Sequence, residues 1–210
     1  VEKTYLPYLL LKAKKYCGIR FDSPDSQGVS DYKGLMTVRR DYAPIARNCV
    51  KQMIDILLAT GSVSAALAPL VTVGERLVSG DFVVEDLLFT RMLKKSYAGG
   101  GNLPHVRVME KCKERAPGSE PLPGTRVPYV VVVHPQDPKA KLFEKAEDPD
   151  WVVAEGLSLD LYYIFKTQVF TPSVDIASFG DTGLVERMLL PALSKLLVRR
   201  DLEVARLNGN

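Results

Sequence analysis

The sequence is poor in the residues that build metal sites and disulfide frameworks. Its 210 residues include three cysteines, Cys17, Cys49 and Cys112, and two histidines, His105 and His134. An odd number of widely spaced cysteines without a C-x-x-C pair indicates neither a disulfide framework nor a zinc site. We therefore expect a reducing, intracellular location and no histidine-based metal site.

Long hydrophobic runs are also missing. No run of about eighteen apolar residues occurs, which predicts no membrane span and no membrane partner. The first residues, Val1 to Tyr5, lack an initial Met and the apolar stretch of a signal peptide. We expect the chain to be a piece of a longer protein.

The composition is that of a globular domain, but the charge is unevenly placed. Hydrophobic residues make up 46% and charged residues 25%, with a net charge of +3. Residues 1–51 carry ten Lys and Arg against five Asp and Glu, and residues 91–126 carry eight against three, whereas residues 137–160 carry three against seven. Two basic stretches suit a polyanion held by two surfaces of one protein. On charge alone, solvated surface faces explain the pattern better.

Helical periodicity is clearest over residues 44–60, where apolar residues recur every fourth position from Ile45 to Leu57. Pro44 suits the first turn, Asp41 suits the positive helix start and Gly61 suits the end. We predict further helices over residues 64–79 (interrupted by Pro69 and Gly74), 104–115, 157–170 and 185–198.

Extended segments are predicted over residues 5–21 and 33–40, which we expect to form a hairpin across the turn-rich residues 22–28. The β-branched run 127–133 predicts another strand. Residues 82–88 fit either a strand or a helix start. Residues 97–102 read as a connector, and residues 141–154 as polar surface.

A basic-aromatic motif, Lys-Ala-Lys-Lys-Tyr, occupies residues 12–16 within the segment from Tyr8 to Ile19. This segment resembles the Lys-Lys-Arg-Tyr segment of family B DNA polymerases. The family pattern falls on residues 13–16, so its first lysine is replaced by Ala13, although Lys12 lies beside that position.

Five further blocks follow in the family's order. Residues 31–41 resemble Lys-Gly-Ile-Glu-Thr-Val-Arg-Arg-Asp, with Met36 in place of Glu. Other similar blocks are residues 82–84, 104–119, 124–131 and the acidic and Tyr-Tyr stretch 146–164. Each block is weak evidence by itself, but six in order and near the family's spacing are specific. Beyond Lys166 the resemblance is loose.

The resemblance implies an α+β fold, with the end of a palm domain over residues 1–43 and a mostly helical thumb with a short β-element over residues 44–210. It implies a fragment of a DNA-directed DNA polymerase that grips a primer–template duplex. The implied DNA-binding residues are Lys12, Lys14, Lys15, Tyr16, Lys33, Gly34, Arg39, Arg40, Arg126 and Tyr129.

Different roles follow for these residues. Lys14 and Tyr16 would lie against the minor groove, and Lys15, Arg39 and Arg40 against primer phosphates. Lys33 and Gly34 would allow close backbone approach to the strand. From the residues alone, a half-buried core aromatic is the favoured reading of Tyr16, and the flanking blocks favour the DNA role instead. Arg126 is equally a surface ion-pair residue. Weaker candidates lie on the helix 104–115: Lys111, Lys113 and Arg115.

The polymerase's own chemistry is missing from this sequence. In the family, two Mg²⁺ ions are held by an Asp in a Leu-Tyr-Pro-Ser context and by an Asp-Thr-Asp turn, and neither context occurs here. The Gly-Asp-Thr of residues 180–182 has Gly183 where the second Asp would stand, and we interpret it as a loop. The Mg²⁺ ligands and the dNTP site are therefore expected upstream in the parent chain, and this fragment alone is expected to be inactive.

The setting and the alternatives follow from the same resemblance. We expect a nuclear or viral replication site, with a processivity factor as a further partner. The absence of a cysteine-rich tail fits a large DNA virus polymerase, and truncation explains it equally well. The alternatives are a non-catalytic DNA-binding or scaffold protein with a polymerase-like thumb, and a structural domain with solvated basic faces.

Overall fold

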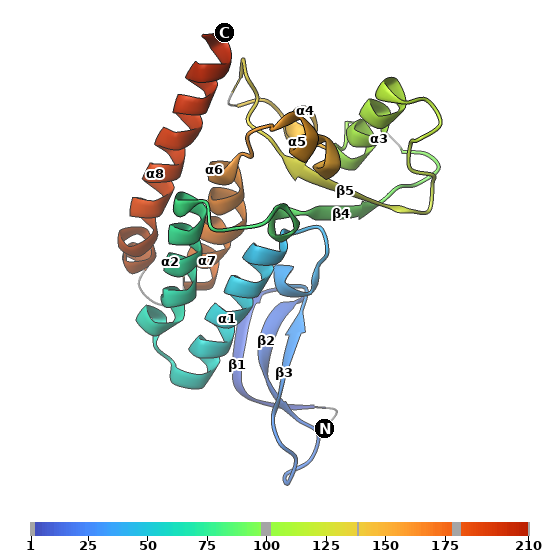
Figure 1. Ribbon diagram of the computed structural model, residues 1–210. Helices are drawn as coiled ribbons and strands as arrows, with labels where there is room; N and C mark the ends of the chain where they lie inside the picture. The colour runs from blue at the N-terminus through green and yellow to red at the C-terminus, as the bar shows by residue number, and fades with distance from the viewer. Residues whose placement is uncertain (1–2, 98–101, 138, 178–181, 210) are drawn as a thin grey trace.

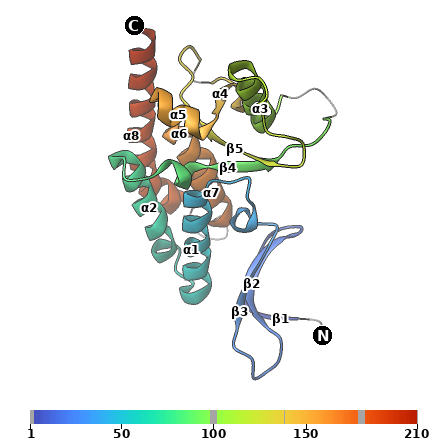
Figure 2. The same cartoon turned by 45° about the vertical axis from the view of Figure 1, so that its right-hand side comes forward.

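The computed structural model describes residues 3–97, 102–137, 139–177 and 182–209 (Figure 1). Two small antiparallel sheets and a set of helices make up the chain, which confirms the predicted α+β class. The N-terminal sheet projects from one end of the helical body, and the second sheet crosses its other end (Figure 2). No helix within the described part of the chain is both long and apolar enough to span a bilayer.

The N-terminal sheet has the order β1-β2-β3, with β1 (Thr4–Lys12), β2 (Lys15–Phe21) and β3 (Val29–Lys33). The predicted single run over residues 5–21 is two strands, because the chain turns at residues 13–14 and Lys12 pairs with Lys15. The turn-rich residues 22–28 do join two strands, β2 and β3.

The predicted strand over residues 33–40 is wrong. Gly34 has a φ of +65°, which ends β3, and Leu35 and Met36 are both buried. Consecutive buried residues do not fit a strand with one solvated face. The chain instead forms a short 3₁₀ helix, η1 (Met36–Val38).

Two long helices follow the sheet and form a hairpin, α1 (Pro44–Thr60) and α2 (Val63–Ser79). The structure confirms α1, with Pro44 in its first turn and Gly61 as its left-handed C-cap. The predicted interruption of α2 is wrong. A side chain at Gly74 would place Cβ 2.7 Å from Ala192 Cβ, so glycine allows the close approach of the C-terminal helix α8 (Thr182–Asn208).

The second sheet contains β4 (Phe89–Met92), β5 (Arg126–Val131) and β6 (Ala146–Glu147), after a short 3₁₀ helix, η2 (Val84–Leu87). Three helices lie against it: α3 (Pro104–Arg115), α4 (Leu142–Lys145) and α5 (Pro149–Glu155) (Figure 1). The predicted helix 104–115 and the strand near residues 127–133 are confirmed. The expectation of polar surface over residues 141–154 fails at Lys145, Ala146 and Glu147, which are buried because β6 pairs with β5.

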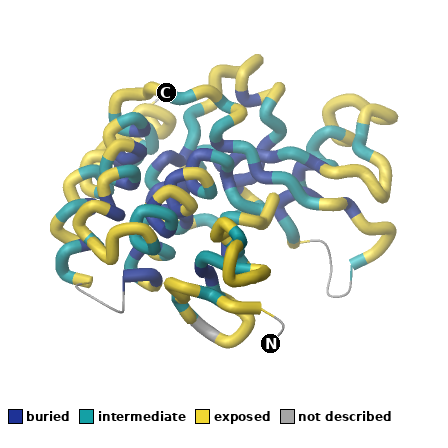
Figure 3. Tube along the Cα trace, turned by 90° about the horizontal axis from the view of Figure 1, so that it is seen from below, coloured by how far each residue is buried: buried dark blue, intermediate teal, exposed yellow. Residues whose placement is uncertain are grey.

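The C-terminal helices complete the body. A continuous helical run starts at residue 161, four positions after the predicted start, and comprises α6 (Leu161–Ile164), the π-helical segment η3 (Phe165–Phe170) and α7 (Thr171–Ala177). One hydrophobic core extends from Cys17 in β2 through α1 and α2 to Leu196 in α8. Burial is concentrated in this body, whereas the N-terminal strands are largely exposed (Figure 3).

Candidate nucleic-acid interface

The tip of the β1–β2 hairpin presents two exposed lysines. Lys14 has a φ of 63°, and among the described residues no other non-glycine residue has a positive φ. Lys14 and Lys15 are both exposed. The left-handed conformation costs an L-residue about 1–2 kcal/mol, and such strain is commonly retained at functional sites. The turn therefore holds Lys14 outward at a cost in stability.

Gly34 lies directly beneath this turn. A Cβ at Gly34 would be 2.2 Å from the carbonyl oxygen of Lys14. Glycine is therefore required here both by its φ of +65° and by the close approach of the Lys14 backbone. From the family resemblance, we expected Gly34 to let the protein backbone approach a DNA strand closely. The close approach present in the structure comes from the Lys14 turn itself.

Tyr16 sits on the outer face of the N-terminal sheet. Its ring centroid lies 5.5 Å from that of Tyr8 and 6.0 Å from that of Tyr5. The next residue, Cys17, points to the opposite face and is fully buried. Tyr16 thus belongs to a half-buried tyrosine cluster and lies outside the main core. Lys33, across from Tyr16 in β3, is exposed and lies 3.6 Å from Asp31.

The two basic stretches of the sequence meet at one open hollow of about 390 Å³. Four arginines and one aspartate are among its lining residues: Arg39, Arg40, Arg91, Arg126 and Asp41. We call these five residues the arginine hollow. The sequence indicated Arg39, Arg40 and Arg126, but not that they share a site.

Asp41 connects two of the arginines of the hollow. Arg39 Nε and Nη2 donate to its two carboxylate oxygens at 2.9 and 2.6 Å, and Arg91 Nη2 donates to the same carboxylate at 3.0 Å. The hydrogen bonds from Arg39, followed by those from Arg91, lower the pKa of Asp41 to about 2 despite partial burial. The carboxylate is therefore ionised at neutral pH. Asp41 is not part of the first turn of α1, as the sequence had suggested, because the N-cap residue of that helix is Ala43.

Arg39 also borders a second hollow, of about 290 Å³, on the side of the hairpin. Lys15, Gly34 and Tyr42 line that hollow with it. Arg39 borders both hollows and so joins Lys15 at the hairpin tip to the arginine hollow. We call Lys14, Lys15 and the arginine hollow together the basic surface. Nothing in the local sequence around Arg91 marks it as part of this surface, because it lies 50 residues from Asp41.

The cations of α3 have a structural role. Arg115 Nη1 and Nη2 each donate to Glu147 at 2.9 Å, and Lys111 Nζ donates to it at 3.1 Å. Burial alone would raise the pKa of Glu147, but the bonds from Arg115 and Lys111 hold it below its usual value. Arg115 also lies 4.0 Å from the Trp151 ring centroid. Lys113 and Arg115 are both exposed, but Arg115 is held by these contacts.

Tyr129 is in the core. It is 3% exposed and stacks on Phe89 with ring centroids 5.1 Å apart. Burial raises its pKa to about 12. A side chain this buried offers no surface to DNA, so we remove Tyr129 from the DNA-binding set. The side chain of Lys12 lies outside what the structure describes.

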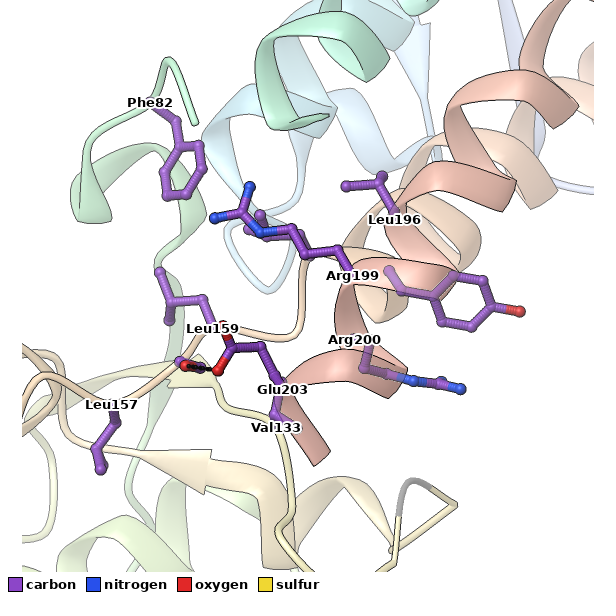
Figure 4. A pocket seen from close by; sticks show the side chains of 11 residues that line it. Phe82, Val133, Leu157, Leu159, Leu196, Arg199, Arg200 and Glu203 are labelled. Atoms are coloured by element: carbon purple, nitrogen blue, oxygen red, sulfur yellow. Dashed lines mark hydrogen bonds between the residues drawn. The ribbon is translucent and has the colours of Figure 1, made fainter. Parts of the chain in front are cut away.

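A separate pocket of about 220 Å³ lies beside α8 (Figure 4). Arg199 on its wall donates to the carbonyl of Val78 at 3.3 Å, and Glu203 accepts a hydrogen bond from Ser158 at 3.0 Å (Figure 4). The Arg200 guanidinium lies 4.5 Å from the Tyr162 ring centroid. These contacts tie α8 to α2, to Ser158 and to α6.

The described residues do not fit a two-metal site. No three His, Cys, Asp or Glu side chains among them come together as metal ligands. Residues 179–181 of the Gly-Asp-Thr loop lie outside the described residues, and α8 begins at Thr182.

Comparison with known proteins identifies the family. The family model described as DNA polymerase family B matches residues 1–178. The chain belongs to this family. The DNA polymerase delta catalytic subunit of Drosophila melanogaster is 35% identical over 176 residues, which cover 83% of this chain and 16% of that protein. A DNA polymerase of Paramecium bursaria Chlorella virus NY2A is 32% identical, over 81% of this chain and 18% of the viral protein.

A solved structure of this family agrees. The family B DNA polymerase from the archaeon Pyrobaculum calidifontis superposes with a TM-score of 0.61 and 27% identity, over 83% of this chain and 21% of that chain. The chain therefore spans about a sixth to a fifth of the length of these family B relatives.

Proposed function

We propose that this chain is the primer–template-gripping region of a family B DNA polymerase, with the end of the palm over residues 1–43 and the thumb over residues 44–210. One observation carries the proposal. Basic residues from two separate parts of the family match, Arg39 and Arg40 in one and Arg126 in the other, border a single open hollow. Lys14 and Lys15 extend this basic surface along the hairpin tip.

Such a surface suits a polymerase because duplex DNA must be held without preference for its sequence. Phosphate contacts from Lys and Arg supply affinity but carry no base information. Minor-groove acceptors occupy equivalent places on every correct base pair. We assign the groove contacts to Lys14 and Tyr16, the phosphate contacts to Lys15, Arg39, Arg40 and Arg126, and the flanking positions to Lys12, Lys33 and Gly34.

The remaining parts of the proposal concern the parent protein. Nucleotide addition would use Mg²⁺ and dNTP held by upstream parts of the parent chain, so that this region alone adds no nucleotides. A processivity factor, and a nuclear or viral replication site, complete the proposal. The names of the relatives support it, because they include a delta catalytic subunit and viral DNA polymerases.

Lys14→Gly tests the grip and separates it from folding. Glycine relieves the left-handed strain at φ 63°, so the free energy of unfolding should stay unchanged or rise by up to about 1 kcal/mol. Duplex binding should nevertheless weaken by about three- to tenfold, because one charged contact is lost. Fluorescence anisotropy with primer–template duplexes carrying each of the four terminal base pairs measures both the loss and its uniformity.

Lys195→Ala is the matched control, because it removes an exposed lysine from α8. It should leave duplex affinity within about twofold. A loss at Lys14 that depends strongly on which correct pair ends the primer would contradict the proposed groove contact, and so would a loss equal to that of the control.

A further inference from the structure

One carboxylate stands among the four arginines of the arginine hollow, at a place where a bare negative charge would repel DNA. Asp41 binds Arg39 from its own segment and Arg91 from β4, 50 residues away. The same two segments are joined by backbone contacts, since the Thr90 amide and hydroxyl donate to the Arg40 carbonyl at 3.3 and 3.1 Å. These contacts hold residues 39–41 and β4 together at the rim of the hollow.

The arginines of the hollow keep donors to spare. Each guanidinium has five N–H donors; Arg39 uses two on Asp41 and Arg91 uses one. Arg40 and Arg126 form no ion pair with any residue that the structure describes. Four positive charges against one negative charge leave the hollow strongly cationic, and planar guanidinium forks match the oxygens of a phosphate.

We propose that the arginine hollow binds a phosphodiester of the DNA backbone, that Arg91 is one of its ligands, and that Asp41 is the positioning residue that orients Arg39 and Arg91 toward it. This inference rests on the proposed grip on duplex DNA and adds two residues to it. Asp41 holds both side chains in place before DNA arrives, so less side-chain entropy is lost on binding.

The direction in which Asp41→Asn changes duplex affinity tests the positioning role. If Asp41 were only a nearby negative charge, its removal would strengthen DNA binding. A positioning residue gives the opposite result, and we expect duplex affinity to fall by about three- to tenfold as two charge-assisted contacts lose their orientation. Asp81→Asn is the matched control, because Asp81 forms an exposed ion pair with Arg76 at 3.1 Å outside the hollow. The control should bind duplex as the wild type does, or slightly more tightly.

Arg91→Lys supplies a second variant that keeps the charge and leaves Asp41 in place. Lysine cannot form the planar fork, so a single neutral methylphosphonate linkage at the contacted position should weaken duplex binding less in this variant than in the wild-type chain. The wild-type chain should lose about threefold or more at that linkage. A scan of single linkages along both strands locates the position.

The outcomes separate this inference from the proposed function. If the wild-type chain shows no salt-dependent duplex binding, the proposed function fails. If it binds duplex but Asp41→Asn binds as tightly or more tightly, only the positioning role fails. If no single neutral linkage weakens the wild-type chain, the hollow holds no backbone phosphate, and a free anion is its ligand instead.

Discussion

Gly34→Ala should damage both the fold and the DNA grip, because the glycine supports the Lys14 turn. The new Cβ would lie 2.2 Å from the Lys14 carbonyl oxygen, about 1 Å closer than a tolerable contact. The φ of +65° adds strain for any residue with a side chain. The turn must therefore move away from β3, and Lys14 must move with it.

The magnitude has two parts. The left-handed backbone costs about 1–2 kcal/mol, and overpacking against the Lys14 backbone adds about 1–3 kcal/mol. Gly61→Ala isolates the first part, because Gly61 has a φ of +67° and a Cβ there would meet nothing within 4 Å. The free energy of unfolding should fall by about 1–2 kcal/mol in the control and by about 2–5 kcal/mol at Gly34.

Urea unfolding measures the stability difference, and anisotropy with a primer–template duplex measures the grip. Gly34→Ala should weaken duplex binding at a temperature where the variant remains folded, whereas Gly61→Ala should bind as the wild type does. Equal losses of stability in the two variants would refute the contact between Gly34 and the Lys14 turn. Unchanged duplex binding by Gly34→Ala would refute the role of that turn in the grip.

Three further predictions concern the interior and the arginine hollow. Glu147→Gln should lower the free energy of unfolding by about 1–3 kcal/mol, since Arg115 and Lys111 lose an ionised hydrogen-bond partner, and should leave the salt dependence of duplex binding unchanged. Tyr129→Phe should bind duplex within about twofold of the wild type, whereas Tyr129→Ala should lose about 3–5 kcal/mol of stability in urea. The pKa of Asp41 is depressed from 3.8 to about 2, so its contribution of at most about 2.5 kcal/mol is present above pH 4 and lost as pH falls toward 2. Urea unfolding from pH 5 to pH 2 should show a shallower acid loss for Asp41→Asn, and an equal loss would contradict the ion pair.

Local signals sufficed for the helix α1. Its apolar period, Pro44 in the first turn and Gly61 at the end are all contained within the segment. The same reasoning failed for α2, where Gly74 and Pro69 read as interruptions. Gly74 is a contact point with Ala192, 118 residues later in the chain, and no local pattern reports such a contact.

The hairpin tip shows a similar limit. The apolar and aromatic run over residues 5–21 gave the strands, but the turn at Ala13 and Lys14 carries neither glycine nor proline. The turn is held by tertiary contact with Gly34 instead. Amino-acid composition does not reveal that a non-glycine residue such as Lys14 adopts the left-handed conformation.

The basic surface was predicted only in part. Family resemblance pointed to Arg39, Arg40 and Arg126, because these lie in recognisable blocks. It did not indicate Arg91. Arg91 pairs with Asp41 only because the fold places β4 beside residues 40–41. The resemblance placed Tyr129 in the DNA-binding set, but a strand residue has two possible faces, and Tyr129 lies on the buried one, where it stacks on Phe89.

The salt dependence of primer–template binding tests the central claim most directly. For a chain that holds duplex DNA through several Lys and Arg contacts, the logarithm of the binding constant should fall linearly with the logarithm of salt concentration, by about 0.9 per phosphate neutralised. Lys15 neutralises one phosphate and the arginine hollow at least one more, so the slope should be about −2 or steeper and independent of duplex sequence. A flat salt response would contradict the account and leave the basic surface as a solvated face.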